Sequence, residues 1–328
     1  MSTRTYLGGD AATDVLYNIE NIVGSVNADT ITGDANNNTI EGGLGNDTLD
    51  GGAGTDTVSY ASATSAITLN LATTTAQNTV GAGTDTITNF ESILGSAFND
   101  TLTGNTGNNI IEGGAGDDVM DGAAGTDTVS YSTATAGVTV SLATATSQNT
   151  VGAGSDTITN FENLTGSSFA DTLTGSTGNN IITGGGGNDT IDGGAGTDTV
   201  VFSGNRKQYT ITSGSDGGGA FYTIVDNRGA SPDGTDKVYG TESFQFADGT
   251  IAAASLLNAS PTAKVDSTTV FRGISTVFDP RANDTLASGT ALSITAIVDT
   301  LGGGTVTNFS GAGSSVTLSN GTVLTLRS

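Results

Sequence analysis

Twelve stretches of nine residues share one pattern, most complete in Gly42–Asp50 and Gly193–Val201. The pattern places glycine at places one, two and four, Asp or Asn at place six, and a large aliphatic residue at place eight. The stretches form three sets of four, and the sets begin at Gly24, Gly95 and Gly166, 71 residues apart. Self-similarity of this kind predicts identical units that stack on one another.

Each place in the pattern has a physical role. Glycine permits positive φ angles and lets another loop approach closely. The last three residues, such as Thr-Ile-Thr, favour short strands in which the central side chain points one way and its neighbours the other. Burying one aliphatic residue per nine contributes only about 1.5 to 3 kcal/mol, too little to offset the entropy of ordering nine residues. The residues expected inside are Ile31, Ile40, Leu49, Val58, Leu102, Ile111, Met120, Val129, Leu173, Ile182, Ile191 and Val200.

The charge of the chain is concentrated in these repeats. The net charge is −24, and residues 5–205 hold 23 of the 33 acidic residues but no Lys or Arg. Such a region repels itself unless it is disordered or a bound species neutralises it, and the regular aliphatic residues argue against disorder. Nucleic acid and anionic membranes are poor partners for it, and no apolar stretch is long enough to span a membrane.

The composition also excludes several kinds of chemistry. The chain has no His and no Cys, so it can form neither a Ser-His-Asp triad, a thiol nucleophile, a His-ligated zinc site nor a disulfide. Hard cations such as Ca2+ bind six to eight oxygens, and a glycine-rich turn exposes its carbonyls beside the Asp at place six. The repeats therefore predict Ca2+ binding. The alternative is that Asp and Gly are simply turn residues facing water, but a dozen loops in register disfavour it.

These motifs resemble the RTX (repeats-in-toxin) nonapeptide of secreted bacterial proteins, over residues 24–59, 95–130 and 166–201. The resemblance implies an all-β fold, a right-handed parallel β-roll over residues 24–201, in which two nonapeptides make one turn. It also implies that each Ca2+ lies between one loop and the loop two units later. The implied pairs are Asp29 with Asp47, Asn38 with Asp56, Asp100 with Asp118, Asn109 with Asp127, Asp171 with Asp189, and Asn180 with Asp198.

Backbone carbonyls of repeat glycines are expected to complete these shells. The expected glycines are Gly42, Gly43, Gly45, Gly51, Gly52, Gly54, Gly113, Gly114, Gly116, Gly122, Gly125, Gly184, Gly185, Gly187, Gly193, Gly194 and Gly196. The sites with Asn in place of Asp are expected to be weaker. An imperfect unit precedes each set, and it predicts a third ion shared by Asp14 and Asp29, by Asp85 and Asp100, and by Asp156 and Asp171. Nine Ca2+ in total would bring +18 against the −23 of the repeat region.

The segments outside the repeats carry weaker signals. Residues 65–71 and 136–142 alternate apolar and polar residues and predict longer, half-buried strands. The aromatic residues of segment 202–251 predict a cap on the end of the roll, with a ligand groove as the alternative. Residues 252–263 are expected to form a linker.

The two ends of the chain leave their roles open. Residues 264–328 predict a small β domain that resembles both an incomplete immunoglobulin-like module and the C-terminal signal of type I secretion, and Asn320-Gly321 favours a hairpin. Residues 1–23 form a partial repeat, which suggests either a fragment or an end covered by another copy. Head-to-tail stacking would build a filament or layer, and electron microscopy with Ca2+ would reject it if only monomers appeared.

The sequence thus predicts a secreted, Ca2+-folded structural or adhesive protein of a bacterial surface or matrix, not an enzyme. Its expected partners are Ca2+, other copies of itself and cell-surface polysaccharide. One alternative is the non-catalytic tail of a secreted hydrolase or polysaccharide-modifying enzyme. Another is a flat threonine ladder that binds ice or a sugar, which a thermal hysteresis assay would test.

Overall fold

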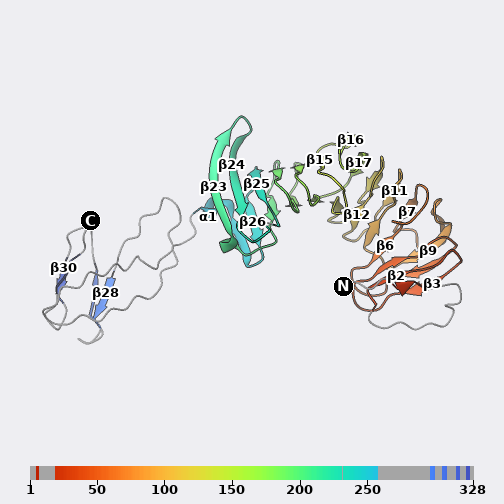
Figure 1. Ribbon diagram of the computed structural model, residues 1–328, viewed down its shortest axis with the longest axis horizontal. Helices are drawn as coiled ribbons and strands as arrows, with labels where there is room; N and C mark the ends of the chain where they lie inside the picture. The colour runs from red at the N-terminus through yellow and green to blue at the C-terminus, as the bar shows by residue number, and fades with distance from the viewer. Residues whose placement is uncertain are drawn as a thin grey trace. The chain divides into compact units, whose positions relative to one another are not determined.

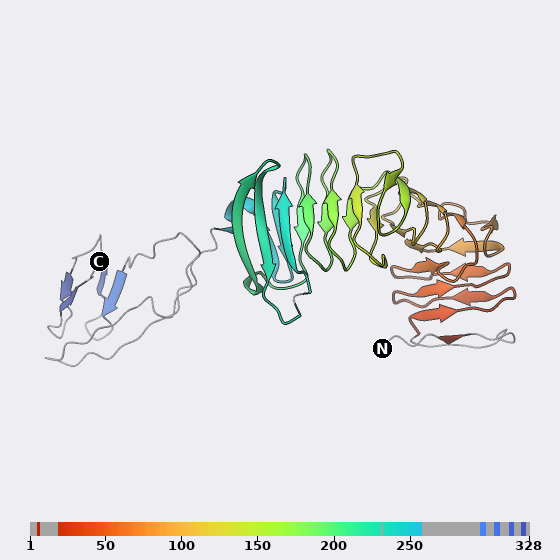
Figure 2. The same ribbon diagram turned by 45° about the horizontal axis from the view of Figure 1, so that its top comes forward.

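The computed structural model describes residues 5–6, 19–230 and 232–257, together with the backbone of four short strands at 296–299, 305–308, 315–317 and 323–325. The chain divides into two compact units, Met1–Ala253 and Ala254–Ser328. The short strands of the first unit stack as successive rungs along two faces (Figures 1 and 2).

One face is a single sheet of 12 strands, parallel except at its last pair. In spatial order these strands are β1 (Thr5–Tyr6), β2 (Asn21–Val23), β4 (Thr39–Glu41), β6 (Thr57–Ser59), β10 (Ser92–Leu94), β12 (Ile110–Glu112), β14 (Thr128–Ser130), β18 (Asn163–Thr165), β20 (Ile181–Thr183), β22 (Thr199–Val201), β26 (Ser243–Phe246) and β27 (Gly249–Ala252).

The opposite face is divided into three sheets. The first holds β3 (Thr30–Thr32), β5 (Thr48–Asp50), β9 (Thr84–Thr88) and β8 (Gln77–Asn78). The second holds β16 (Gln148–Asn149), β17 (Ser155–Thr159), β13 (Val119–Asp121), β11 (Thr101–Thr103) and β7 (Thr68–Asn70). The third holds β15 (Thr139–Ser141), β19 (Thr172–Thr174), β21 (Thr190–Asp192), β25 (Thr235–Tyr239), β24 (Gly219–Asp226) and β23 (Tyr209–Asp216).

The register follows from the nonapeptide. Within a set, each strand pairs in parallel with the strand two units later, for example Thr30 with Thr48 and Ile111 with Val129, which is an offset of 18 residues. All twelve aliphatic residues at place eight are buried, as predicted. The prediction of short parallel strands in stacked sheets is therefore confirmed, and the arrangement is consistent with a β-roll.

Neighbouring residues of β12 provide a matched test of this core. Ile111 is fully buried, whereas Ile110 is 44% exposed. Ile111→Ala should lower the free energy of unfolding of the Ca2+-loaded chain by about 2 to 5 kcal/mol, because it leaves a cavity. Ile110→Ala should change it by no more than about 0.5 kcal/mol. Urea unfolding in saturating Ca2+ measures both, and equal losses would contradict the assignment of the interior face.

A long excursion interrupts the stack after β6 and again after β14. Residues 60–83 run out from β6, form β7 and β8, and return to β9, which pairs with β5. The bridge between Ile67 and Val80 brings β7 beside β8, and β7 pairs with β11 on its other side. Residues 131–154 repeat this path with β15, β16 and β17.

The predicted strands 65–71 and 136–142 are found in these excursions but are shorter than expected. Only three residues of each form a strand, β7 and β15. The predicted alternation is present, because Ile67, Leu69 and Leu71 are buried while the threonine of β7 is exposed.

Two buried glutamates hold the start of the excursions. Glu112 accepts hydrogen bonds from the backbone N–H of Thr133 (2.6 Å) and from the hydroxyl of Ser130 (2.8 Å). Glu41 accepts one from the N–H of Ser62 in the equivalent turn (3.0 Å). The corresponding residue of the third set is Thr183, and the segment that leaves β22 there, residues 202–234, forms the hairpin of β23 and β24 before β25.

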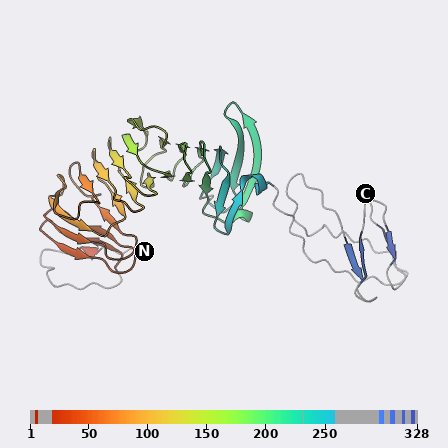
Figure 3. The ribbon, with the colours of Figure 1, turned by 180° about the vertical axis from the view of Figure 1, so that it is seen from behind.

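Residues 202–253 close the stack. β25 and β26 extend the two faces by one parallel rung, after which β24, β23 and β27 add antiparallel strands (Figure 3). A 3-10 turn at Arg206–Gln208 precedes β23, and the short helix α1 (Ala253–Leu256) follows β27. The rings of Phe202, Tyr209 and Phe246 pack together with centroids 5.3–5.5 Å apart and are buried, which favours a cap over a ligand groove.

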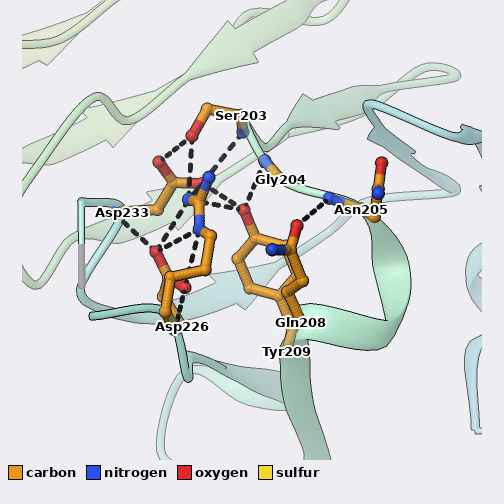
Figure 4. Close-up of polar contacts among 8 residues, drawn as sticks. Ser203, Gly204, Asn205, Gln208, Tyr209, Asp226 and Asp233 are labelled. Carbon is orange, nitrogen blue, oxygen red and sulfur yellow. Dashed lines mark hydrogen bonds and ion pairs between the residues drawn. The ribbon is translucent and has the colours of Figure 1, made fainter. Parts of the chain in front are cut away.

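One arginine fixes the turns of this cap. The Arg228 guanidinium forms ion pairs with Asp226 (2.7 Å) and Asp233 (3.0 Å), and it holds the pKa of Asp226 down at about 2. The hydroxyl of Tyr209 donates to Asp233, and the backbone of Ser203 donates to the same carboxylate (Figure 4). Here, unlike in the repeats, carboxylates have a cationic side chain beside them.

In the second unit, β28 (Ala296–Asp299) pairs antiparallel with β29 (Thr305–Asn308), and β30 (Ser315–Thr317) pairs antiparallel with β31 (Val323–Thr325). The predicted Asn320-Gly321 turn lies between the last two strands in the sequence but outside the described residues, as do residues 258–263 of the predicted linker and most of segment 264–328.

Candidate calcium sites

The turns between the two faces form two edges of the stack. We call the turns that enter β3, β5 and β9 the first edge, and those that enter β4, β6 and β10 the second edge. On the first edge, Asp47 Oδ1 accepts the backbone N–H of Asp29 (2.9 Å), and Asp85 Oδ1 accepts that of Asp47 (2.9 Å). On the second edge, Asp56 Oδ1 accepts the N–H of Asn38 (2.7 Å). Each acidic side chain thus reaches back to the preceding rung.

The third and fourth nonapeptides of every set leave one carboxylate oxygen unsatisfied. In each case Oδ1 bonds to backbone, but Oδ2 is buried and has no hydrogen-bond partner. An ionised oxygen buried in this way costs several kcal/mol unless a positive charge compensates for it. The six unpartnered oxygens belong to Asp47, Asp56, Asp118, Asp127, Asp189 and Asp198.

Backbone carbonyls converge near the aspartates. A side chain built on Gly24 would lie 2.2 Å from the carbonyl oxygen of Gly42 and 2.8 Å from Asp29 Oδ2. Gly95 and Gly166 are enclosed in the same way by the equivalent carbonyl and carboxylate. Only glycine leaves room here, so the first glycine of the nonapeptide opens a cradle lined with oxygen atoms. Within the described residues no three acidic side chains gather, so carbonyls must supply part of any cation's shell.

The predicted positive φ is found for the expected ligand glycines at places two and four, and not for those at place one. Those at places two and four have positive φ, as in Gly43 (95°) and Gly45 (140°). The same holds for Gly52, Gly54, Gly114, Gly116, Gly125, Gly185, Gly187, Gly194 and Gly196. The glycines at place one bring their Cα against the Asp of the same unit, as in Gly42, Gly113 and Gly184, where an added side chain would lie 2.2–2.3 Å from Oδ2.

Burial changes the acidity of these carboxyls. It raises the pKa of Asp47 to about 6 and that of Asp118 to about 7, and the negative charges of neighbouring aspartates add to the effect. The pKa of Asp189 rises to about 7 for the same reasons. Burial also raises the pKa of Asp85, Asp100, Asp127, Asp156, Asp171 and Asp198.

The match to known sequences agrees with this geometry. The family model of the RTX calcium-binding nonapeptide repeat, which contains four copies, matches residues 23–58, 94–129 and 165–200. The chain contains three arrays of RTX nonapeptide repeats. RTX repeats are Ca2+-binding modules typical of extracellular proteins exported by type I secretion.

Other comparisons are more distant. No curated protein matches the RTX chain. Among solved structures, the extracellular lipase LipA from Serratia marcescens matches with a TM-score of 0.25 and 13% identity, covering 73% of this chain and 40% of the lipase. The RTX chain therefore spans less than half the length of that protein. Among the described residues, no helix is long and apolar enough to cross a membrane.

The asparagines of the RTX arrays differ from the aspartates. Asn109 Oδ1 accepts the N–H of Asn105 (2.8 Å), and its Nδ2 donates to the carbonyl of Glu91 (3.1 Å). Asn38 and Asn180 make equivalent bonds, donating to the carbonyls of Ile19 and Glu162. An aspartate here would face a carbonyl oxygen with its negative charge, which gives a reason for Asn. The ligand role of these asparagines stays a prediction.

The residues preceding each RTX set are paired differently from the prediction. Asp85 follows Asp47 on the first edge, and β8 and β7 lie between its strand and β11. The oxygen Oδ1 of Asp100 instead accepts the N–H of Ile67 (2.7 Å). The excursion thus separates Asp85 from Asp100, and Asp156 from Asp171 in the same way, so the arrangement gives no support to an ion shared within either pair. Asp14 lies outside the described residues.

Sequence reasoning missed several members of the two edges. Asp236 Oδ1 accepts the N–H of Asp189 (2.9 Å), and burial raises the pKa of Asp236 to about 8. Tyr60 and Tyr131 donate from their buried hydroxyls to Asp85 and Asp156 (3.0 Å each). One signal in the sequence could have revealed these acidic residues. An Asp is followed six positions later by a Glu in three places, 85–91, 156–162 and 236–242.

Proposed function

We propose that this RTX protein is an extracellular structural or adhesive module whose first compact unit, Met1–Ala253, folds as it binds Ca2+. The six buried, unpartnered carboxylate oxygens carry the proposal. No Lys or Arg occurs between residues 5 and 205 to neutralise them. The carboxylates, the repeat-glycine carbonyls and the positive-φ turns are the oxygen donors and backbone shape that a hard cation requires.

The fold and its charge explain why binding and folding are coupled. The interior has about one aliphatic side chain per nonapeptide, so burial of apolar surface is small for each residue ordered. Without a cation, folding would bring ionised aspartates into contact along both edges. Where Ca2+ is scarce, as inside a cell, we expect an extended polyanion suited to passage through a secretion channel. At about 10⁻⁴ to 10⁻³ M, where extracellular modules bind Ca2+, the free energy of binding becomes free energy of folding.

A titration tests this proposal. Far-UV circular dichroism of the chain in chelator should show little β structure, and Ca2+ added to about millimolar free concentration should produce a cooperative gain of β signal. Mg2+ at the same concentration is the control. It requires a small octahedral shell and retains its waters, so it should not replace Ca2+ in these larger cradles. A β spectrum that stays unchanged when chelator is added would contradict the proposal.

A further inference from the structure

Three glutamates outside the nonapeptides take the place of a repeat aspartate on the second edge. Glu91 Oε2 accepts the backbone N–H of Asp56 (2.9 Å), just as Asp56 accepts that of Asn38. Glu162 accepts the N–H of Asp127 (2.8 Å), and Glu242 accepts that of Asp198 (2.8 Å). Each set of four nonapeptides is therefore followed on this edge by a glutamate in the next rung.

The turns that carry these glutamates are shorter than a nonapeptide loop. The first-edge Asp85 and the second-edge Glu91 are separated by six residues instead of nine, and the longer side chain of glutamate compensates for the shorter turn. The turn is made by a residue with positive φ, Asn89 (57°) in this copy. Its side chain donates to Asp50 (2.7 Å), which holds the turn against the preceding rung. Asn160 (57°) and Gly240 (52°) stand at the equivalent positions.

A carbonyl and a buried carboxylate converge beside each glutamate. A side chain on Gly51 would lie 2.0 Å from the carbonyl oxygen of Asn89 and 3.0 Å from Asp56 Oδ2. For Gly122 the distances are 2.2 Å to Asn160 and 3.0 Å to Asp127, and for Gly193 they are 2.1 Å to Gly240 and 3.0 Å to Asp198. The three aspartates are at most 1% exposed, and their Oδ2 atoms are among the unpartnered oxygens.

The short turn thus reproduces the donors of a nonapeptide loop. Within the repeats, the carbonyl of Gly51 approaches Gly33 (2.2 Å to an added side chain), as that of Asn89 approaches Gly51. The carbonyl of Asn89 therefore replaces that of a first glycine, and the carboxylate of Glu91 replaces that of an aspartate at place six.

We propose that an additional Ca2+ site follows each set of four nonapeptides, at the end of its second edge. After the first set, Asp56, the carbonyl of Asn89 and Glu91 form this site. The equivalent sites are formed by Asp127, Asn160 and Glu162, and by Asp198, Gly240 and Glu242. The proposal rests on the Ca2+-dependent folding proposed above. It extends the cation sites beyond the nonapeptides, into the short turns that follow β9 and β17 and into the cap that follows the third set. The ion joins the last rung of each set to the segment that follows it.

Counting bound ions tests the proposal. Equilibrium dialysis with metal analysis should show that the variant Glu91→Gln/Glu162→Gln/Glu242→Gln binds about three fewer Ca2+ per chain than the wild type at saturation. Each single variant should bind one fewer. Glutamine retains an oxygen that accepts the backbone N–H, so the hydrogen-bonded frame is preserved. The matched control is Asp34→Asn/Asp216→Asn/Asp248→Asn, which removes the same charge from exposed positions and should bind as many ions as the wild type.

The outcomes separate the two proposals. A glutamine triple variant that binds as many ions as the wild type, and folds at the same Ca2+ concentration, would overturn the additional sites and leave Ca2+-dependent folding intact. A wild-type chain that binds no Ca2+ would overturn the proposed function itself. If the triple variant does not fold, the single variants decide, and a single variant that retains every ion counts against the sites. Glu91→Asp keeps the charge but shortens the reach, and it too should lose one ion.

Discussion

Acidifying the calcium-free chain from about pH 8 to about pH 5 should produce much of the β structure that Ca2+ produces at neutral pH. The pKa values of Asp47, Asp118 and Asp189 are about 6 to 7 in the folded chain, against an ordinary value of 3.8. Between those values the folded chain holds protons that the unfolded chain has lost. Stability without Ca2+ therefore falls as pH rises through this window and is recovered as pH falls.

Protons and Ca2+ then compete for the same oxygens. Where the calcium-free chain is folded and protonated, the Ca2+ concentration at half-saturation should increase as pH falls below about 7, by about tenfold per pH unit if one proton leaves for each ion bound. Circular dichroism over pH in buffer stripped of Ca2+ measures the first effect, and calorimetric Ca2+ titration at each pH measures the second. If the calcium-free chain stayed unfolded throughout this pH range, ionisation of the buried carboxyls would not be what prevents it from folding.

Removing the charge by mutation should separate folding from Ca2+ binding. In Asp47→Asn/Asp118→Asn/Asp189→Asn, each asparagine oxygen can still accept the N–H of the preceding rung, but the buried group at these three positions no longer carries a negative charge. We expect the calcium-free variant to contain more β structure than the calcium-free wild type. Its Ca2+ midpoint, meaning the Ca2+ concentration at half-saturation, should rise at least about tenfold, because ligand charge is a main determinant of affinity. Its calcium-free pH dependence should also be weaker.

The exposed triple variant Asp34→Asn/Asp216→Asn/Asp248→Asn again serves as the control. It changes the net charge of the chain by the same amount without touching a buried carboxyl. If both triple variants shifted the Ca2+ midpoint equally, the effect would be one of overall charge, and the buried sites would not account for it. Calorimetric titration and circular dichroism on the two variants give this comparison.

Periodicity explains which parts of the fold were predictable. Ile111 and Met120 recur at a fixed place in a repeat, so their strands, register and burial follow from the pattern alone. The position of β7 does not, because its partner β11 is 33 residues away and no repeat connects them. The pairing of Asp85 with Asp47 depends on that displaced strand, and for this reason the prediction paired it with Asp100 instead.

The glutamates were missed for a different reason. Glu91 accepts a backbone N–H as a repeat aspartate does, but in a turn of different length. A search for acidic residues at intervals of nine therefore does not find it. Asp236 and Glu242 were missed because they lie among the aromatic residues of the cap, although their spacing equals that of Asp85 and Glu91. A residue's place along the edge, more than its place in the nonapeptide, decides which donors it meets.

The path of the excursions limits the order in which the molecule can assemble. β7 precedes β9 along the chain but lies beyond it in the stack, and the N–H of Leu71, which follows β7, bonds to the carbonyl of Thr103 in the following set. A chain that emerges gradually can pair β9 with β5 and β10 with β6, but β7 completes its ladder only when β11 is present. Until then β7 meets only β8, through the bridge between Ile67 and Val80. The excursion strand therefore joins two successive 71-residue units, and the second of them completes the packing of the first.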